Sequence, residues 1–173
     1  MTKIVRASIQ HIDELLTLAP KSFIDSHGHS ASASDIDYYI ERNFNETIFR
    51  NELLDKQIAY FLIYDDEQLA GYSKLTLNAT NSCVTAQSAT KLDRLYLLKA
   101  FYGRDLGKEL MLFNLNFSKQ NHQQGMWLFV WKENPRAIAF YQKNGFKIVG
   151  EGDFKISESH SNPNHIMYLD YQV

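Results

Sequence analysis

The apolar residues of this chain recur at two spacings, one typical of helices and the other typical of strands. Leu106, Leu110 and Phe113 follow one another at intervals of three or four residues, which predicts an amphipathic helix over residues 105–121. Four further helices are expected over residues 11–18, 35–44, 46–54 and 135–144.

Runs rich in β-branched and aromatic residues predict the strands. The runs at residues 58–64 and 69–78 flank Asp65-Asp66-Glu67-Gln68, a polar tetrapeptide typical of a hairpin turn. Other strands are expected over residues 3–8, 91–98, 126–131, 146–151 and 165–171. This order of elements predicts a mixed α/β chain whose strands cluster around two later helices.

Polar residues mark where the early helices begin. Ser34 with Asp35 is placed to cap the helix at 35–44, and Asn45 is placed to cap the next helix. The segment SHGHSASAS at residues 26–34 contains only small and polar residues. It is therefore expected to be a mobile connection within one domain.

Length and composition predict a single domain over residues 1–173. The chain is 45% hydrophobic and 22% charged, which is enough apolar material for one sizeable core. Its longest apolar run, residues 58–64, is far shorter than the ~18 residues of a membrane helix, and charged residues occupy the amino terminus. We therefore expect a soluble cytoplasmic protein. Cys83 is the only cysteine, so no internal disulfide is expected.

Charge is distributed unevenly along the chain. Residues 11–70 contain 12 acidic and 4 basic residues, whereas residues 71–150 contain 11 basic and 4 acidic residues. A positive half suits an anionic cofactor and a negative half suits a cationic co-substrate, although ordinary solvated helix faces explain the same pattern. No contiguous basic stripe is present, so nucleic acid is not an expected partner.

Histidines give little indication of a metal site. His27 and His29 lie in one polar loop, and His160 and His165 are distant in sequence. Loop histidines without cysteine partners rarely bind a metal, so none is expected.

The start of the helix at 105–121 is suited to binding phosphate. In residues 101–108, FYGRDLGK, the first helical amides have no intrahelical acceptor, and the helix dipole adds partial positive charge. Gly103 and Gly107 allow close approach of an anion, while Arg104 and Lys108 add mobile positive charge. A simple turn before a helix is the alternative interpretation.

The helix at 135–144 combines strong end signals with one phenol. Asn134 is a favourable N-cap, Pro135 suits the first helical position, and Gly145 ends the helix. Tyr141 lies one turn from Ala137, so both residues can face the same groove. A core aromatic with a satisfied hydroxyl is the alternative role for Tyr141.

Together these segments resemble the GNAT family of N-acetyltransferases. The family's second motif, Asn-x-x-Ala-x-x-x-Tyr-x-x-x-Gly-Phe, is present in full as Asn134, Ala137, Tyr141, Gly145 and Phe146. Its phosphate loop, Gln/Arg-x-x-Gly-x-Gly/Ala, is only partly matched.

The phosphate loop departs from the family at two positions. Tyr102 stands where the family has Gln or Arg, and Asp105 replaces the first motif glycine. Within the family the chain resembles the PaiA type of polyamine acetyltransferase over most of its length. That likeness includes residues 38–45, the hairpin at 61–72, and residues 127–146.

The resemblance implies a GNAT fold: a mixed, mostly antiparallel central sheet of about six to seven strands, splayed between the fourth and fifth strands and flanked by helices. It implies acetyl-CoA as co-substrate, lying where strand 91–98 diverges from strand 126–131, and it allows a homodimer. The cofactor-binding residues that it implies are Leu95, Tyr96, Leu97, Tyr102, Gly103, Arg104, Asp105, Leu106, Gly107, Lys108, Asn134, Ala137 and Tyr141.

The implied reaction is direct transfer of an acetyl group from the thioester to a primary amine. An alkylammonium with a pKa near 10.4 is only about one part in 2,500 neutral at pH 7, so a base must remove its proton. Asp93 is the candidate base, acting through water, and Glu133 is a second candidate; a surface carboxylate is the alternative for both. Tyr141 is expected to assist departure of the thiolate.

A polyamine acceptor would require separated carboxylates and aromatic faces. Such residues occur together in one segment: Asp35, Asp37, Tyr38, Tyr39 and Glu41. The two faces of an ordinary helix are the alternative explanation. Other acceptors left open are a protein amino terminus, a lysine side chain and another small amine. A noncatalytic acyl-CoA-binding module is the rival from a different functional class.

Overall fold

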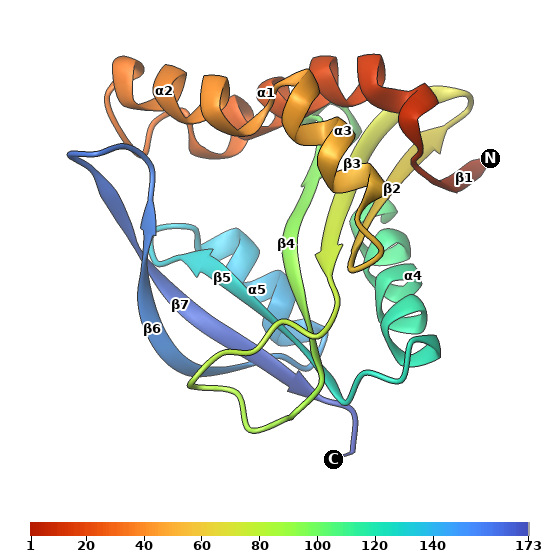
Figure 1. The fold of residues 1–173 in the computed structure, drawn as a ribbon, viewed down its shortest axis with the longest axis vertical. Helices are drawn as coiled ribbons and strands as arrows, with labels where there is room; N and C mark the ends of the chain where they lie inside the picture. Colours follow the sequence, from red (N-terminus) through yellow and green to blue (C-terminus); the bar gives the residue numbers. More distant parts are fainter. Residues whose placement is uncertain (173) are drawn as a thin grey trace.

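The computed structural model describes residues 1–172, which form a seven-stranded mixed sheet with helices on both faces (Figure 1). The strand order is β1-β2-β3-β4-β5-β7-β6, and β4 with β5 is the parallel pair. The strands are β1 (Thr2–Arg6), β2 (Ile58–Asp65), β3 (Gln68–Thr76), β4 (Ala89–Leu97), β5 (Gly125–Trp131), β6 (Lys147–Lys155) and β7 (Ser161–Asp170). The predicted mixed, mostly antiparallel sheet is confirmed.

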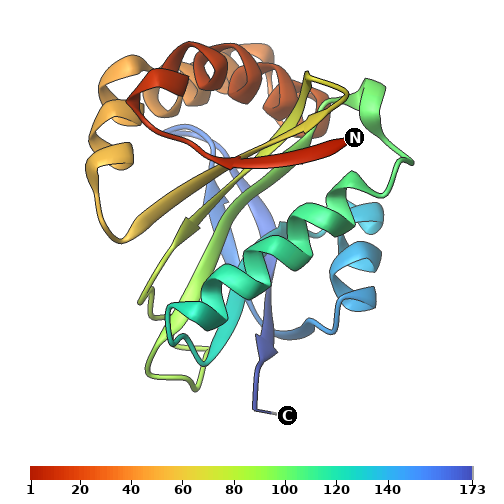
Figure 2. The same ribbon diagram turned by 90° about the vertical axis from the view of Figure 1, so that its right-hand side faces the viewer.

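Three helices cover one face of this sheet and two cover the other, as Figure 2 shows. The first group contains α1 (Ile12–His27), α2 (Ala33–Asn43) and α3 (Glu46–Leu54), and the second contains α4 (Leu106–Gln120) and α5 (Pro135–Lys143). Short 3-10 turns cover Ile9–His11 and Lys99–Phe101. No helix in residues 1–172 combines the length and apolar character that crossing a membrane requires.

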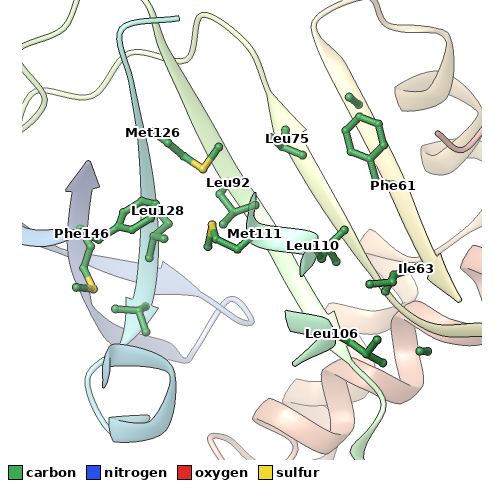
Figure 3. Packing of buried hydrophobic residues seen from close by; sticks show 14 of the residues in the cluster. Phe61, Ile63, Leu75, Leu92, Leu106, Leu110, Met111, Met126, Leu128 and Phe146 are labelled. Carbon is green, nitrogen blue, oxygen red and sulfur yellow. The ribbon is translucent and has the colours of Figure 1, made fainter. Parts of the chain in front are cut away.

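The helical period at residues 105–121 predicts part of the buried face of α4: Leu106 and Leu110 are buried, whereas Phe113 is 37% exposed. Leu110 and Met111 have no exposed surface and pack against Leu92 and Met126 of the sheet (Figure 3). A buried side chain of this size contributes roughly 1.5–3 kcal/mol to folding. This packing fixes the amino-terminal end of α4 beside the end of β4.

The first helix is longer than its predicted residues 11–18. α1 continues through Pro20, which removes one backbone donor from the helix. Leu18, Ala19 and Phe23 are almost completely buried on either side of Pro20, so tertiary packing maintains the helix. The prediction of a mobile connection over residues 26–34 is therefore wrong at both ends, because Ser26 and His27 belong to α1 and Ala33 and Ser34 belong to α2.

One predicted cap is wrong and another is confirmed. α2 begins two residues earlier than expected, and the hydroxyl of Ser32, not Ser34, accepts a hydrogen bond from the Asp35 amide at 3.2 Å. The side chain of Asn45 caps α3 by accepting from the Ile48 amide at 3.0 Å.

β4 and β5 separate after a short stretch of pairing. Only Ala89, Thr90 and Lys91 of β4 have partners on β5, and the strands then diverge, as expected for the fourth and fifth strands (Figure 1). The amide of Leu98 donates to Ala70 of β3 at 2.8 Å. Because backbone groups alternate along a strand, Leu95 and Leu97 direct theirs toward the gap.

A β-bulge in β4 changes which side chains share a face. Arg94 pairs with Lys74 of β3, but the next residue of β3, Leu75, pairs with Leu92, so Asp93 is an extra residue. Leu92 and Leu95 consequently face α4 and α5. Asp93 and Arg94 both lie on the opposite face.

Candidate active site

A cavity of about 710 Å³ lies in the gap between β4 and β5 and is lined from both faces of the sheet. On one face, Ala137 and Tyr141 of α5 contribute to its wall, and on the other, His27 of α1 and Tyr39 of α2 do so. Because β4 and β5 separate, one cavity extends from one face of the sheet to the other.

Tyr141 points its phenol into this cavity without an internal partner. The ring packs edge-on against Phe140 and Phe146, with centroids 5.4 and 5.8 Å away. Its hydroxyl makes no hydrogen bond to any residue in the range 1–172. Burial raises the pKa of Tyr141 above its ordinary value, so the phenol stays protonated and able to donate.

Asn134 fixes the start of α5 and retains a free donor. Its side-chain oxygen accepts from the Ala137 amide at 3.1 Å, as the predicted N-cap does. This bond uses the oxygen and leaves the amide hydrogens available to the cavity that Asn134 lines.

The start of α4 presents unpaired amides next to the cavity. Gly103 and Asp105 both adopt left-handed backbone conformations, with φ of 79° and 59°. The Asp105 side chain is exposed and forms no capping bond, and its carbonyl accepts from the amides of Lys108 and Glu109 at 3.0 Å. The amides of Leu106 and Gly107 lie too early in the helix to have intrahelical acceptors. They form an anion-binding terminus.

Arg136 stacks on Tyr102, the residue at which the predicted phosphate loop departs from the expected Gln or Arg. The Arg136 guanidinium lies 3.9 Å from the centre of the Tyr102 ring, and both residues line the cavity. Lys99 lines the same end. In contrast, Arg104 lies outside the lining and pairs with Asp65 at 3.0 Å. The positive charge here thus comes from Arg136 of α5 and from Lys99 of the 3-10 turn.

The opposite side of the cavity contains ion pairs. Asp93 accepts from the Thr76 hydroxyl at 2.6 Å and pairs with Lys91 at 3.0 Å. Lys74 pairs with Glu52 at 2.5 Å. Each of these carboxylates therefore has its own cation.

Aromatic and imidazole rings form the wall near the end of β5. The Trp131 ring lies 6.2 Å from His27 and 5.2 Å from His29. His27 also stacks on Phe23, with centroids 5.1 Å apart. Burial, with a smaller contribution from His29, lowers the pKa of His27 to about 4, so the His27 ring is neutral at pH 7.

The predicted site residues divide between the cavity lining and other surfaces. Predicted cofactor residues in the lining are Leu95, Tyr96, Leu97, Tyr102, Gly107, Asn134, Ala137 and Tyr141, and both candidate bases, Asp93 and Glu133, also belong to it. Outside it are Gly103, Arg104, Asp105, Leu106 and Lys108, which lie at the amino-terminal end of α4 or in the turn before it.

The predicted acceptor segment contributes only Tyr39 to the lining. Asp35 bonds to the Ser32 hydroxyl at 2.5 Å, and Tyr38 bonds to Glu158 at 3.1 Å. Asp37 and Glu41 are exposed on α2. The structure therefore does not gather these four polar residues around the cavity.

Many polar or charged lining residues were not among the predicted site residues, and they include Lys74, Arg94, His27 and Arg136. A sequence signal existed for two of them, because Lys74 and Arg94 each interrupt an apolar strand. A charged residue is rarely buried in a strand unless it is paired or hydrogen-bonded, so such a position is a candidate for a functional site.

The histidines do not converge on a metal site. His160 contacts the Ser30 carbonyl at 3.0 Å and the Asn162 side chain at 2.9 Å. Across residues 1–172, no three His, Cys, Asp or Glu side chains are grouped suitably for a metal ion.

Comparison with known proteins gives consistent matches. Residues 13–146 match the family model described as the acetyltransferase (GNAT) family. An uncharacterised N-acetyltransferase of Lactobacillus delbrueckii subsp. lactis is 27% identical over 156 residues, which cover 90% of each protein. A spermidine N(1)-acetyltransferase of Thermoplasma acidophilum is 25% identical over 150 residues, covering 84% of this chain and 88% of that protein.

Solved structures share the fold. The PaiA N-acetyltransferase of Thermoplasma acidophilum, solved in complex with coenzyme A, has a TM-score of 0.79 and 23% identity, with 99% of both chains covered. An N-acetyltransferase of Staphylococcus aureus has a TM-score of 0.73 and 17% identity, covering 98% of this chain and 97% of that one.

The lowered pKa of His27 predicts acid sensitivity of folding. The unfolded chain, with an ordinary histidine pKa near 6.5, binds more protons than the folded chain between that pH and about 4. Stability is therefore lost as pH falls through this window. We expect His27 to account for roughly 2 kcal/mol of the loss between pH 7 and pH 4.5, measured by urea unfolding of wild type and His27→Phe.

The control for this prediction is His122→Asn. His122 is exposed with φ of 58°, a conformation that asparagine tolerates. His122→Asn should keep the wild-type pH dependence. An equal loss in wild type and His27→Phe would contradict the assignment.

Proposed function

The chain belongs to the acetyltransferase (GNAT) family and uses acetyl-CoA as co-substrate, and we propose that it acetylates a primary amine by direct attack on the thioester. The observation that carries this proposal is the unpartnered Tyr141 hydroxyl in the gap between β4 and β5. The following steps assign roles to the residues around it.

The gap offers a binding edge for the pantetheine arm. Leu95 and Leu97 direct unpaired backbone groups into it, because β5 has already diverged. An extended amide-containing arm can hydrogen-bond to such an edge as an additional strand would. Asn134 donates to the arm from the side of α5.

The pyrophosphate is assigned to the start of α4. Free amides of Leu106 and Gly107, together with the helix dipole, favour negative charge there. Arg136, stacked on Tyr102, supplies a mobile cation beside the same terminus. This arrangement offsets the loss of the family's Gln or Arg.

Tyr141 is assigned to the departing sulfur. A thiol with a pKa near 8.5 is more acidic than a phenol near 10, and burial raises the phenol's pKa further. Complete proton transfer to the thiolate is therefore uphill. Tyr141 acts by donating a strong hydrogen bond to the sulfur as negative charge develops on it.

Asp93 is assigned as the base that removes a proton from the acceptor's ammonium group through water, which leaves the neutral amine that attacks the thioester. It lines the cavity on the face opposite Tyr141, and its contacts with Thr76 and Lys91 hold it in place. Glu133, at the exposed rim, is the second candidate.

A polyamine such as spermidine or spermine is the acceptor that relatives support. The spermidine N(1)-acetyltransferase of Thermoplasma acidophilum shares 25% identity with this chain over 150 residues. Aromatic walls such as the one around Trp131 also suit alkylammonium groups.

Replacing Arg136 tests whether this residue supplies the positive charge beside the pyrophosphate. We expect Arg136→Ala to raise the dissociation constant of CoA roughly fivefold to tenfold, because a phosphate-facing cation is lost. Arg104→Ala should change it less than about twofold, since Arg104 pairs with Asp65 outside the cavity. Isothermal titration calorimetry measures both. A larger effect of Arg104→Ala would contradict this assignment.

Replacing Tyr141 tests the proposed reaction. Tyr141→Phe should lower kcat by roughly 100-fold with acetyl-CoA and spermidine, because a hydrogen bond made in the transition state is lost. CoA affinity should stay within about twofold, since the ring remains. Thiol release and calorimetry measure the two quantities.

The outcome separates the parts of the proposal. Unchanged kcat in Tyr141→Phe removes this residue from the mechanism. Absence of thiol release with spermidine and spermine excludes the polyamine assignment, and CoA binding without transfer to any amine identifies a noncatalytic module.

Replacing Asp93 tests the base. Asp93→Asn should lower kcat/KM by roughly 10²-fold at pH 7, with partial recovery as pH approaches the pKa of the amine, near 10. At that pH much of the acceptor is already the free amine and no longer needs a base. Glu133→Gln is the matched control and should retain the wild-type pH profile. Equal losses for Asp93→Asn at pH 7 and pH 10 would favour a purely structural role.

A further inference from the structure

The side chain of Lys91 places an alkylammonium group at the wall of the cavity. Lys91, Asp93 and Phe129 all line this cavity. The Lys91 Nζ pairs with the Asp93 carboxylate at 3.0 Å. It also lies 5.3 Å from the centre of the Trp127 ring and 5.5 Å from that of the Phe129 ring. A carboxylate and two aromatic rings are the groups that hold ammonium ions in proteins. We call Asp93, Trp127 and Phe129 the ammonium site.

The three side chains of the ammonium site have contacts of their own, apart from Lys91. The Thr76 hydroxyl donates to Asp93 at 2.6 Å. Trp127 is 4% exposed, and its indole N–H donates to a backbone carbonyl at 2.8 Å. The Phe129 ring packs edge-on against Trp127, with centroids 5.5 Å apart. These contacts keep the ammonium site in place when the Lys91 ammonium leaves it.

Lys91 is held in the ammonium site by few interactions. Its side chain is 28% exposed, and Asp93 is its only ion-pair partner within residues 1–172. A partly exposed ion pair contributes little to stability, and a lysine side chain has several rotatable bonds, so another alkylammonium can replace it at little cost. A polycation in the same cavity is repelled by the Lys91 charge until that exchange takes place.

We infer that a second ammonium of the polyamine binds in the ammonium site and displaces the Lys91 ammonium, so that Lys91 competes with the acceptor. The inference rests on the proposed amine acetylation and assigns a position to the far end of the acceptor. It makes Lys91 and Phe129 determinants of specificity for diamines over monoamines.

The spacing of the two positions fits a polyamine. The reacting nitrogen is assigned to the free edge of β4 near Leu95, two residues after Asp93, which corresponds to ~7 Å along an extended strand. Three or four methylene groups, as in spermidine, span a comparable length. Asp93 then contacts the second ammonium directly and the reacting ammonium through water.

Lys91→Met tests the competition between Lys91 and the acceptor. For wild type and variant, thiol release from acetyl-CoA gives kcat/KM with 1,4-diaminobutane and with butylamine, which lacks only the second ammonium. We expect the diamine-to-monoamine ratio to rise roughly fivefold to tenfold in Lys91→Met, because the competing cation is gone. Any effect of Lys91 on Asp93 as the base applies to both amines and cancels in the ratio.

The matched control is Lys155→Met. Lys155 also lines the cavity and also pairs with a carboxylate, that of Glu158 at 3.0 Å. Its replacement removes the same charge from the lining but leaves the ammonium site unchanged, so the ratio should stay within about twofold of wild type. An equal rise in both variants would indicate a general effect of charge and would overturn the specific role of Lys91.

Phe129→Leu tests the aromatic part of the ammonium site. Combined with Lys91→Met, it should lower the diamine-to-monoamine ratio by about threefold or more, because an aromatic face beside the second ammonium is lost. Leucine keeps an apolar side chain at this position of β5. An unchanged ratio would exclude Phe129 from the site. Circular dichroism verifies that each variant folds, and Lys91→Gln serves in place of Lys91→Met if the latter does not.

The outcomes separate this inference from the function on which it rests. Thiol release with an unchanged or lowered ratio in Lys91→Met overturns the displacement of Lys91 and leaves amine acetylation standing. Absence of release with any amine overturns the proposed function itself.

Discussion

The early end of pairing between β4 and β5 is the constraint on which the site depends. Pairing stops after Lys91, so the rest of β4 has one edge bonded to β3 and one edge free inside the protein. Unpaired backbone groups that are shielded from bulk water need partners. Met126 and Leu128 of β5 lie in the same buried cluster as Leu92 of β4 (Figure 3). The free edge of β4 is thus the surface that we propose for the pantetheine arm.

The bulge at Asp93 adds a second constraint that acts on side chains. Without the extra residue, Asp93 and Arg94 would lie on opposite faces, and one of them would enter the apolar layer beneath α4. With it, both reach the polar side of the cavity, where Thr76, Lys91 and Tyr60 contact them. The bulge in β4, rather than a loop, therefore places these two charged residues on the same face.

Sequence patterns predicted the elements whose signals are local. The period of α4, the caps at Asn45 and Asn134 and the hairpin between β2 and β3 each involve residues a few positions apart. Features set by distant contacts were not predictable: α1 runs through Pro20 because its buried face packs on other elements. The exposed carboxylates of α2 looked suitable for an acceptor, but only tertiary structure decides which helix face meets the cavity. The bulge in β4 decides the face of the sheet on which Arg94 lies, and it has no recognisable pattern in the sequence.

The two faces of the sheet divide the proposed chemistry. Tyr141 reaches the gap from the layer of α4 and α5, whereas Asp93 reaches it from the layer of α1 to α3. An incoming amine and a departing sulfur must occupy different positions around the tetrahedral carbon, and the open strand edge is where the two faces meet. A phenol whose pKa is raised by burial stays protonated for the sulfur, and the Asp93 carboxylate, held by Lys91 and Thr76, is the base that we propose for the amine. β4 itself separates the two groups, so in the proposed reaction the phenol meets the sulfur on one face of the sheet and the carboxylate meets the amine on the other.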